Sequence, residues 1–189
     1  MRRHVLRHAR FLLALAVLPA GCAPGQDLPL VANPPALEYR LGGGDQVRII
    51  VLGGDELSGE YRLDGDGRIA VPLLGTVNAG GLTVAQFQQE LTNGLKRGQI
   101  LRDPSVSVQV QTYRPVFVLG EVAKPGEYPY QPGMTMLTVV AVAGGFTYRG
   151  VQDYAAVVRS DRGTVIEGKV EPGSRIVPGD VVKVFERRF

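Results

Sequence analysis

The sequence predicts an α+β protein made of two small β-rich modules, each a sheet with one helix. Valine alternates with Ser or Gln over residues 105–111, which is typical of a strand with one buried face. Asp-Gly and Pro-Gly pairs separate short β-prone runs, as tight turns do in antiparallel sheets. Apolar residues recur at three- and four-residue steps over 84–95, and residues 136–143 are apolar nearly all round, which predicts two helices.

Residues 1–21 predict a secretory signal peptide. Basic residues precede a short apolar run over 11–18, and small residues follow it. The run is far shorter than the roughly 20 residues that a membrane-spanning helix needs. Both histidines, His4 and His8, lie in this segment, so the mature chain has no imidazole.

Cys22, the only cysteine, directly follows the signal. Residues 18–22 resemble a bacterial lipobox, although Pro19 stands where leucine is expected. One interpretation makes Cys22 a lipid-attachment site, with several acyl chains anchoring the protein stably. The other is ordinary signal cleavage nearby, with Cys22 an incidental thiol or part of the discarded segment.

Residues 22–36 predict an extended tether. This stretch contains four prolines together with Gly25 and Asn33, a composition that favours extended chain over a packed element. We expect it to hold the folded part of the protein away from the membrane.

Residues 37–112 form the first predicted module. Thr83 and Gln86 have the spacing of a capping box, which places the start of the helix at this point. The remaining predicted elements are a glycine turn over 42–45, a strand over 46–51, a hairpin of 61–63 with 68–71 around Asp64-Gly65-Asp66-Gly67, and a strand over 105–111 after Asp103-Pro104.

Residues 113–189 form the second predicted module. Thr135 caps its short helix and Gly144-Gly145 ends it, and a helix this apolar is expected to be buried against a sheet. The predicted strands are a hairpin of 116–122 with 127–130, a hairpin of 157–159 with 164–166, and a last strand over 181–185. A sheet wrapped on one short helix predicts a β-grasp arrangement.

The composition of the mature chain excludes several kinds of site. Without histidine and with one cysteine, it has neither a Ser-His-Asp nor a Cys-His nucleophile, and only carboxylates for zinc. Removing the four signal arginines from 21 Lys and Arg leaves 17 against 18 Asp and Glu, a net charge of about −1. The longest basic clusters that remain are pairs, so no nucleic-acid partner is expected. We also expect no cofactor and no metal.

Two motifs have both a chemical and a structural interpretation. The glycine run at 42–45 suggests a phosphate-binding loop. However, no Gly-Lys-Ser/Thr follows it, and a strand is predicted where such a loop requires a helix, so a tight turn is favoured. Residues 64–67 invite a calcium loop, but Arg68 and Gly75 occupy expected ligand positions, which favours a hairpin turn.

Paired carboxylates are the one catalytic option left, because glycoside hydrolysis needs only two acids. The candidates are Asp55, Glu56, Asp64 and Asp66. They lie in polar turns, and the chain has no Trp to stack on a sugar ring. Solvated turn acids are the favoured interpretation, so we expect no enzyme and no catalytic residues.

The order and spacing of the motifs resemble one family, the outer-membrane polysaccharide export proteins (capsule or exopolysaccharide translocon lipoproteins). The resemblance covers most of residues 37–189. The resembling segments are Tyr39–Asp45, Glu56–Tyr61, Asp64–Ile69, Val71–Gly75, Gly81–Thr83, Asp103-Pro104 with the alternating strand, Tyr113–Pro115, Val118–Val122, Lys124–Gly126 and Ala143–Thr147.

This resemblance implies a polysaccharide export domain followed by a soluble-ligand-binding β-grasp domain. It implies a homo-oligomeric ring that conducts polysaccharide without catalysis, in the periplasm and lipid-anchored to the outer membrane, in contact with an inner-membrane co-polymerase. Gly43 stands where the family usually has proline. A second departure is that no helix of membrane-spanning length follows residue 145, so the chain resembles a short form.

Two other functions stay open: a monomeric periplasmic glycan-binding module and a secreted carboxylate-dependent glycosidase. For glycan contact the candidates are Tyr113, Arg114, Tyr148 and Arg149, which lie at module junctions and can stack on or hydrogen-bond to sugars. Alternatively, these four side chains pack a joint between modules or subunits.

Overall fold

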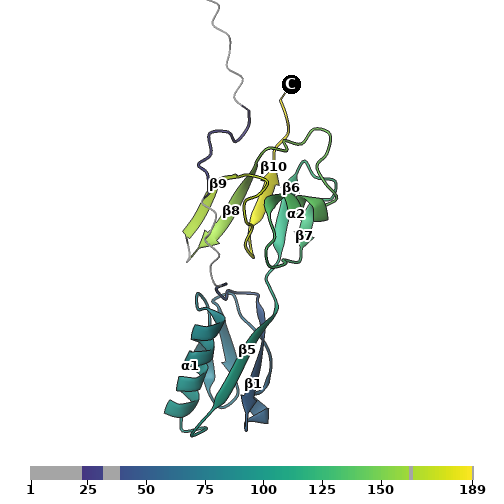
Figure 1. Cartoon of the computed structure of the whole chain (residues 1–189). Coiled ribbons are helices and arrows are strands. Elements are labelled where there is room, and N and C mark those ends of the chain that lie inside the picture. Colours follow the sequence, from purple (N-terminus) through teal and green to yellow (C-terminus); the bar gives the residue numbers. More distant parts are fainter. Residues whose placement is uncertain (1–22, 32–38, 162–163, 189) are drawn as a thin grey trace, which may run out of the picture.

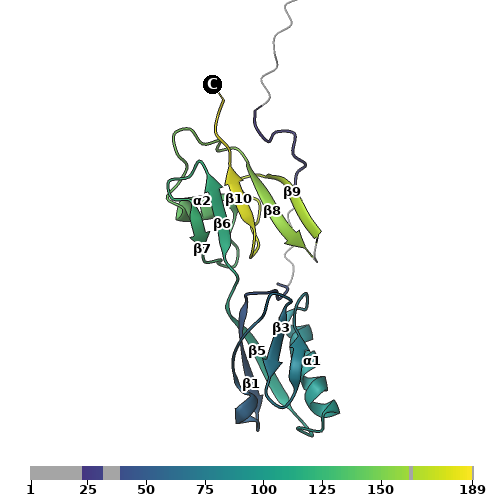
Figure 2. The same ribbon diagram turned by 180° about the vertical axis from the view of Figure 1, so that it is seen from behind.

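The computed structural model describes residues 23–31, 39–161 and 164–188. Two modules are stacked end to end, and the chain passes from the lower to the upper one between strands β5 and β6 (Figures 1 and 2). Each module has its own cluster of buried apolar side chains and its own helix. This is the mixed α+β organisation that the sequence predicts.

The first module contains a three-stranded antiparallel sheet of order β2-β1-β5, a separate β3-β4 hairpin and helix α1. Its elements are β1 (Gln46–Leu52), the 3-10 helix η1 (Asp55–Leu57), β2 (Gly59–Arg62), β3 (Arg68–Val71), β4 (Gly75–Asn78), α1 (Val84–Arg97) and β5 (Ser105–Thr112).

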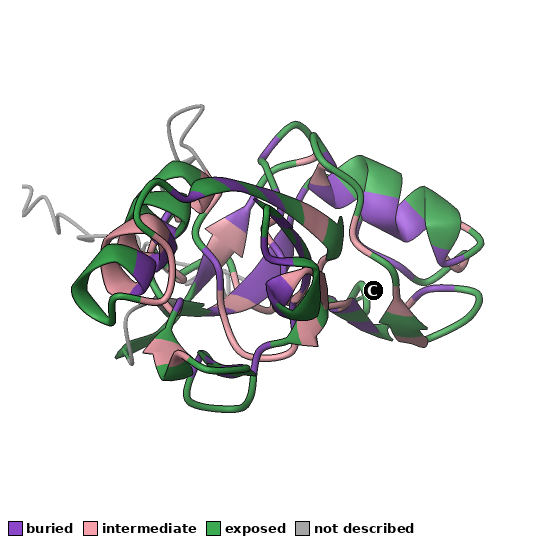
Figure 3. Cartoon of the chain, turned by 90° about the horizontal axis from the view of Figure 1, so that it is seen from below, coloured by how far each residue is buried: buried purple, intermediate pink, exposed green. Residues whose placement is uncertain are grey.

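Alternating side chains of the sheet make one half of the first core. Val106 and Val108 of β5 are buried while their neighbours are exposed, and this alternation is visible along the strands in Figure 3. Helix α1 supplies the other half through Phe87, Leu91 and Leu95. Burying each of these side chains stabilises the fold by roughly 1.5–3 kcal/mol. The predicted capping box is confirmed: Thr83 Oγ1 accepts from the Gln86 amide, and the Gln86 side chain accepts from the Thr83 amide.

The turn at residues 64–67 forms, but the predicted hairpin around it is wrong. Asp64 Oδ1 accepts the Arg68 amide at 2.8 Å, as a turn acid does. The flanking strands then separate, because β2 pairs with β1 and β3 pairs with β4. Gly67, with φ +76°, accepts the Gly80 amide at 2.8 Å, and this contact directs β3 onto its own partner.

The second module is a five-stranded mixed sheet of order β7-β6-β10-β8-β9 with helix α2 on one face. Strands β6 and β10 are parallel, and the other pairs are antiparallel. Its elements are β6 (Val116–Gly120), β7 (Gly126–Tyr128), α2 (Met136–Val142), β8 (Ala155–Asp161), β9 (Thr164–Val170) and β10 (Val181–Val184). Both predicted hairpins and the Thr135 cap are confirmed, whereas the β-grasp assignment remains a prediction.

Residues 23–31 contact the second module, although the sequence predicts a tether without packing contacts. Tyr154 donates its hydroxyl to the Pro24 carbonyl at 2.9 Å. Lys169 of edge strand β9 donates its amide to the Pro29 carbonyl at 2.7 Å and accepts the Val31 amide at 2.9 Å. An edge strand has unpaired backbone groups, and this segment satisfies some of them. The rest of the predicted tether, Cys22 and residues 32–36, lies outside the described residues.

Among the residues that the structure describes, no helix is both long and apolar enough to cross a membrane.

Candidate functional site: the joint between the modules

The joint is built around Tyr113 and Arg114, two of the residues predicted to lie at a boundary. They belong to the short connection between β5 and β6. The Tyr113 ring packs edge-on against Tyr39 of the first module, with ring centroids 4.8 Å apart, and against Tyr130 of the second, at 5.5 Å. Three aromatic rings therefore run from one module into the other.

A buried carboxylate, Asp45, holds the first module's side of this joint. Its side chain is fully inaccessible to solvent. Oδ1 accepts the Arg114 amide at 2.9 Å, and Oδ2 accepts the Gly42 amide at 2.8 Å and the Tyr39 hydroxyl. The Arg114 guanidinium lies 3.5 Å from Oδ2 and so neutralises a carboxylate that is costly to bury alone.

The glycine run that precedes Asp45 makes room for these contacts. Gly44 has φ +92°, and the Asp45 amide donates back to the Gly42 carbonyl at 3.1 Å, which closes the predicted turn. A Cβ on Gly42 would overlap Nη1 of Arg114. A Cβ on Gly43 would lie 2.6 Å from the Asp64 carbonyl oxygen. The run is therefore a turn shaped by a neighbouring arginine.

Arg114 also reaches the second module. Its Nε donates to the Pro178 carbonyl at 2.9 Å, and the Gly179 amide donates to the Pro115 carbonyl at 2.9 Å. The Cβ of a side chain at Gly179, where φ is +87°, would lie 2.9 Å from Nε of Arg114. One arginine thus contacts a glycine-containing turn on each side of the joint.

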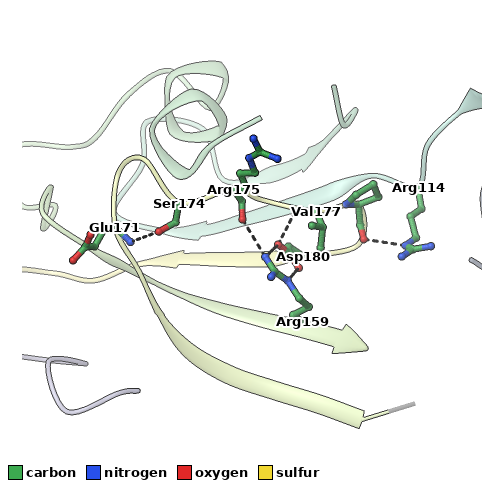
Figure 4. A network of polar contacts seen from close by, with 8 residues as sticks. Arg114, Arg159, Glu171, Ser174, Arg175, Val177 and Asp180 are labelled. Atoms are coloured by element: carbon green, nitrogen blue, oxygen red, sulfur yellow. Dashed lines mark hydrogen bonds and ion pairs between the residues drawn. The ribbon is translucent and has the colours of Figure 1, made fainter. Parts of the chain in front are cut away.

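The turn that receives Arg114 is itself fixed by a second arginine–aspartate pair (Figure 4). Arg159 of β8 binds Asp180 with two parallel hydrogen bonds, Nε to Oδ1 at 2.9 Å and Nη2 to Oδ2 at 2.7 Å. Oδ2 also accepts the Val177 amide at 2.8 Å. Both charged side chains are almost completely buried, so this pair belongs to the interior of the second module.

The environment of the joint favours neutral Tyr39. Burial, and then the hydrogen bond to Asp45, raise the pKa of the Tyr39 hydroxyl far above its usual value. The hydroxyl therefore stays protonated and serves as a hydrogen-bond donor. Every oxygen of Asp45 and Asp180 already has a donor, so this arrangement positions the two modules and offers no free acid or base for proton transfer.

Tyr148 and Arg149 lie away from this joint. Strand β6 starts beside the joint and runs to Gly120, and the Thr147 amide donates to the Glu121 carbonyl, which places residues 147–149 at the opposite end of the module. Tyr148 is 85% exposed, and Arg149 forms an ion pair with Glu186. The structure brings Tyr113 and Arg114 together and leaves the other two near the C-terminal residues.

The other candidate sites are less organised. Asp55, Glu56, Asp64 and Asp66 are all exposed, and the described residues contain no cluster of His, Cys, Asp and Glu placed to hold a metal. A hollow of about 450 Å³ lies beside β1 and β2 on the first module. Charged and apolar side chains share its lining, among them Arg48, Ile50, Leu52, Asp55 and Glu60.

The sequence did not single out Tyr39, Asp45 or the 177–180 turn as parts of one site. Asp45 was predicted only as the end of a turn. One signal was present, because Gly-Asp occurs just before a β-prone run at 44–45 and again at 179–180. Interpreting it needed the structure, which shows that both aspartates are buried and each is close to an arginine.

Comparisons with known proteins give each module a separate match. Residues 33–111 match the family described as "Polysaccharide biosynthesis/export protein", and residues 115–172 match the "SLBB domain". The boundary between the two matches falls at the joint.

Two proteins that are similar to this chain over most of its length have names that refer to exopolysaccharide production or export. The chain is 37% identical over 142 residues to "Exopolysaccharide production protein ExoF" of Rhizobium meliloti, covering 69% of this chain and 32% of that protein. It is 26% identical over 193 residues to "EPS I polysaccharide export outer membrane protein EpsA" of Ralstonia nicotianae, covering 84% and 50%. The chain thus spans about a third to a half of the length of these relatives.

Proposed function

Because the chain belongs to the outer-membrane polysaccharide export protein family, we propose that it is a non-catalytic subunit of a machine that exports a capsule or exopolysaccharide. In this proposal identical subunits form a ring in the periplasm, and the ring conducts the glycan.

The joint is the observation that carries the proposal. Arg114 contacts Asp45 of the export module and Pro178 of the SLBB module, and three tyrosine rings packed edge to face run beside it. In this proposal these contacts hold the two modules of each subunit at a fixed angle. A ring of such subunits needs the fixed angle, because a flexible link in each subunit would let the conduit collapse.

The absence of catalysis is part of the proposal. The buried acids of the two modules, Asp45 and Asp180, are each neutralised by an arginine and fully hydrogen-bonded. Both oxygens of each carboxylate already accept hydrogen bonds from groups of the protein, so neither carboxylate is free to act as a general acid. The family description names both biosynthesis and export, and the Ralstonia relative is named an export protein, which supports transport without chemistry.

The name of a relative and the N-terminal sequence support the proposed location. The Ralstonia relative is named an outer membrane protein. For this chain we propose the periplasm, with attachment to the outer membrane through a lipid on Cys22. Pro24, two residues after Cys22 in the sequence, accepts the Tyr154 hydroxyl of the second module.

The proposed partners are the polysaccharide, further copies of this chain and an inner-membrane co-polymerase. Tyr148 and Arg149 are exposed and remain candidates for glycan or interface contact. Tyr113 and Arg114 are largely occupied by the joint, and we propose for them a structural role there.

Sedimentation of the mature chain in detergent, combined with an export assay in cells that lack the gene, tests the proposal. We expect a single large assembly and restored export of surface polysaccharide. A strict monomer that restores export would instead favour a glycan-binding module. Hydrolysis of the exported glycan, lost when Asp55, Glu56, Asp64 or Asp66 is changed to its amide, would favour a glycosidase.

Cys22→Ser tests the anchor separately. We expect the variant to leave the membrane fraction for the soluble periplasm. Serine at this position cannot carry the acyl chains that we propose for Cys22, and stable attachment needs two or more such chains. If the variant stays in the membrane fraction and supports export, the lipid is not the attachment.

A further inference from the structure

Tyr148 differs from the other six tyrosines of the chain. Each of those six packs its ring against another aromatic ring or donates its hydroxyl to a protein oxygen; they are Tyr39, Tyr61, Tyr113, Tyr128, Tyr130 and Tyr154. Tyr148 makes neither contact with any described residue, and 85% of it is exposed. Both its ring face and its hydroxyl are therefore available to a ligand.

The backbone beneath Tyr148 is held in place. Tyr148 and Arg149 are the two central residues of a turn that the Gly150 amide closes on the Thr147 carbonyl at 3.1 Å. The Thr147 hydroxyl accepts the Arg149 amide at 3.2 Å, and the Arg149 carbonyl accepts the Arg187 amide at 2.8 Å. A side chain on a fixed backbone loses less conformational freedom when it binds a ligand. The turn thus presents an aromatic ring and a guanidinium on adjacent residues.

The surroundings of this turn are basic. Arg149 forms an ion pair with Glu186, and the Arg187 Nε donates to the Gly150 carbonyl at 2.8 Å. Arg188, which is exposed, follows in the sequence. Three arginines against one glutamate give this cluster a net charge of about +2, whereas the mature chain as a whole has about −1. Complementary charge therefore favours an anionic ligand.

The pair of Arg149 with Glu186 leaves the guanidinium open to exchange. About half of each side chain is exposed, and exposed ion pairs contribute little to stability. A ligand carboxylate can therefore replace Glu186 at small cost. Arginine binds a carboxylate with two parallel hydrogen bonds and also donates to hydroxyl groups.

An acidic sugar has the two features that this turn recognises. Its ring presents an apolar face of C–H groups, which packs on an aromatic ring, and its carboxylate pairs with a guanidinium. We propose that Tyr148 and Arg149 bind an acidic polysaccharide, with one sugar ring on Tyr148 and its carboxylate on Arg149. The inference rests on the proposed export function and names the class of glycan. One exposed turn binds weakly, which suits a conducted glycan, because the glycan must leave each site as well as enter it.

A membrane with anionic lipids would match the same charge. The neighbours of the turn favour the glycan, because Phe146 is only partly exposed and Val151 is buried. Tyr148 is thus the one ring that the turn projects. One ring is enough for one sugar, but it gives little apolar area to enter a lipid interface.

Calorimetric titration with oligogalacturonate, an oligomer of an acidic sugar, tests the proposal. The mature chain carries Cys22→Ser, so that neither acyl chains nor detergent are present. The methyl ester of the same oligomer keeps the sugar rings and removes their charge. We expect the acid to bind about tenfold more tightly than the ester, because the ester lacks the hydrogen bonds between two charged groups. Added salt should weaken binding of the acid.

Four substitutions locate the site. Tyr148→Ala should weaken binding of the acid about tenfold, because the stacking surface is lost, whereas Tyr148→Phe should bind nearly like the parent. Arg149→Ala should remove the preference for the acid over the ester. Arg97→Ala is the matched control, since it breaks a comparably exposed pair, Arg97 with Glu90 on α1, and should leave binding unchanged.

The other outcomes overturn the inference in distinguishable ways. Equal binding of acid and ester would exclude an acidic glycan, and unchanged binding by Tyr148→Ala would place the contact elsewhere. Binding to phosphatidylglycerol vesicles that Tyr148→Ala abolishes, without binding of oligogalacturonate, would assign the turn to a lipid surface. Loss of the large assembly in Tyr148→Ala would make the turn an interface between subunits.

No binding of oligogalacturonate at millimolar concentration would also overturn the site. If the wild-type chain still sediments as a large assembly and restores export, the proposed function stands without this site. A wild-type chain that fails in those two assays would contradict the proposed function itself, whatever it binds.

Discussion

Two turns, one in each module, have the same backbone design. In the first turn (residues 42–45) and the second turn (residues 177–180), the aspartate amide donates to the carbonyl three residues earlier at 3.1 Å. In both, Oδ2 of that aspartate accepts the amide of the first residue at 2.8 Å, and the third residue is glycine with φ near +90°. Each turn leads into the central strand of its sheet.

The turns differ in the arginine that each aspartate binds. Asp180 forms a bidentate pair with Arg159 inside its own module, and both side chains are buried. Asp45 binds the backbone amide of Arg114 and lies 3.5 Å from its guanidinium, which also donates to Pro178 of the second turn. About a quarter of the Arg114 side chain is exposed.

One local motif therefore has two uses. Where the arginine comes from a strand of the same sheet, the turn stabilises a core. Where the arginine comes from the connection between modules, the turn helps to set the angle between the two modules. Changes at the second turn should thus affect folding, and changes at the first turn should mainly affect how the modules are held together.

The largest effect is expected for Asp180→Ala. This change leaves the Arg159 guanidinium buried without its counter-charge, and breaking such a pair costs about 3–5 kcal/mol. Urea denaturation followed by far-UV circular dichroism should show the second module unfolding first. Retention of wild-type stability would mean that water reaches Arg159 and that the pair is not part of the core.

The second largest loss of stability is expected for Gly42→Ala, because the new Cβ would overlap the Arg114 guanidinium. Overpacking of this kind costs about 1–3 kcal/mol, here with displacement of Arg114 from the joint. Gly126→Ala is the matched control, since nothing lies within 4 Å of the new methyl group. Equal midpoints of thermal unfolding for the two variants would contradict the packing of Arg114 against the first turn.

Arg114→Ala should cost about 2 kcal/mol. This is less than for Asp180→Ala, because the Arg114 guanidinium is partly exposed and Asp45 keeps its three hydrogen-bond donors in the variant. Its larger effect should be on the angle between modules. Spin labels on Gln89 and Glu127, one exposed site on each module, should give a narrow distance distribution in the parent and a broad one in the variant. Arg149→Ala, which breaks an exposed pair far from the joint, should leave the distribution narrow.

The elements could be predicted from the sequence because their signals are local. The Thr83 capping box, the apolar period of α1 and the alternation over 105–111 each report on residues that are close in the chain. The hairpin at 64–67 failed because its turn is local but its strand pairing is not. A turn determines that the chain reverses direction, but it does not determine which strand the next strand pairs with.

The joint could be predicted only in part. Tyr113 and Arg114 were placed at a boundary by their position between two strand patterns. The contacts of Arg114 with Asp45 and Pro178 span 69 and 64 residues in sequence, and no local pattern encodes such distances. The contact of residues 23–31 with β9 was missed for the same reason, because a Pro-rich composition describes the segment and says nothing of a free edge elsewhere.

The smallest effect is expected for Tyr39→Phe, and its sign depends on pH. At neutral pH the variant loses one hydrogen bond to Asp45, which costs about 1 kcal/mol. Because burial raises the pKa of Tyr39 in the folded protein, the unfolded chain releases this proton first, near pH 10. The stabilisation by Tyr39 is therefore complete below about pH 10 and decreases at higher pH, by up to about 1.4 kcal/mol per pH unit.

The difference in unfolding free energy between wild type and Tyr39→Phe should thus stay constant from pH 8 to about pH 10, shrink above it and reverse near pH 11. Urea titrations at fixed pH values measure it. Other partly buried tyrosines such as Tyr130 also have raised pKa values, so the wild-type curve alone cannot isolate Tyr39, whereas the difference between the two proteins can. Tyr148→Phe, at an exposed position, should show no such trend. A constant difference across this range would mean that the Tyr39 hydroxyl ionises freely in the folded protein, and the joint would then be open to solvent on the side of the first turn.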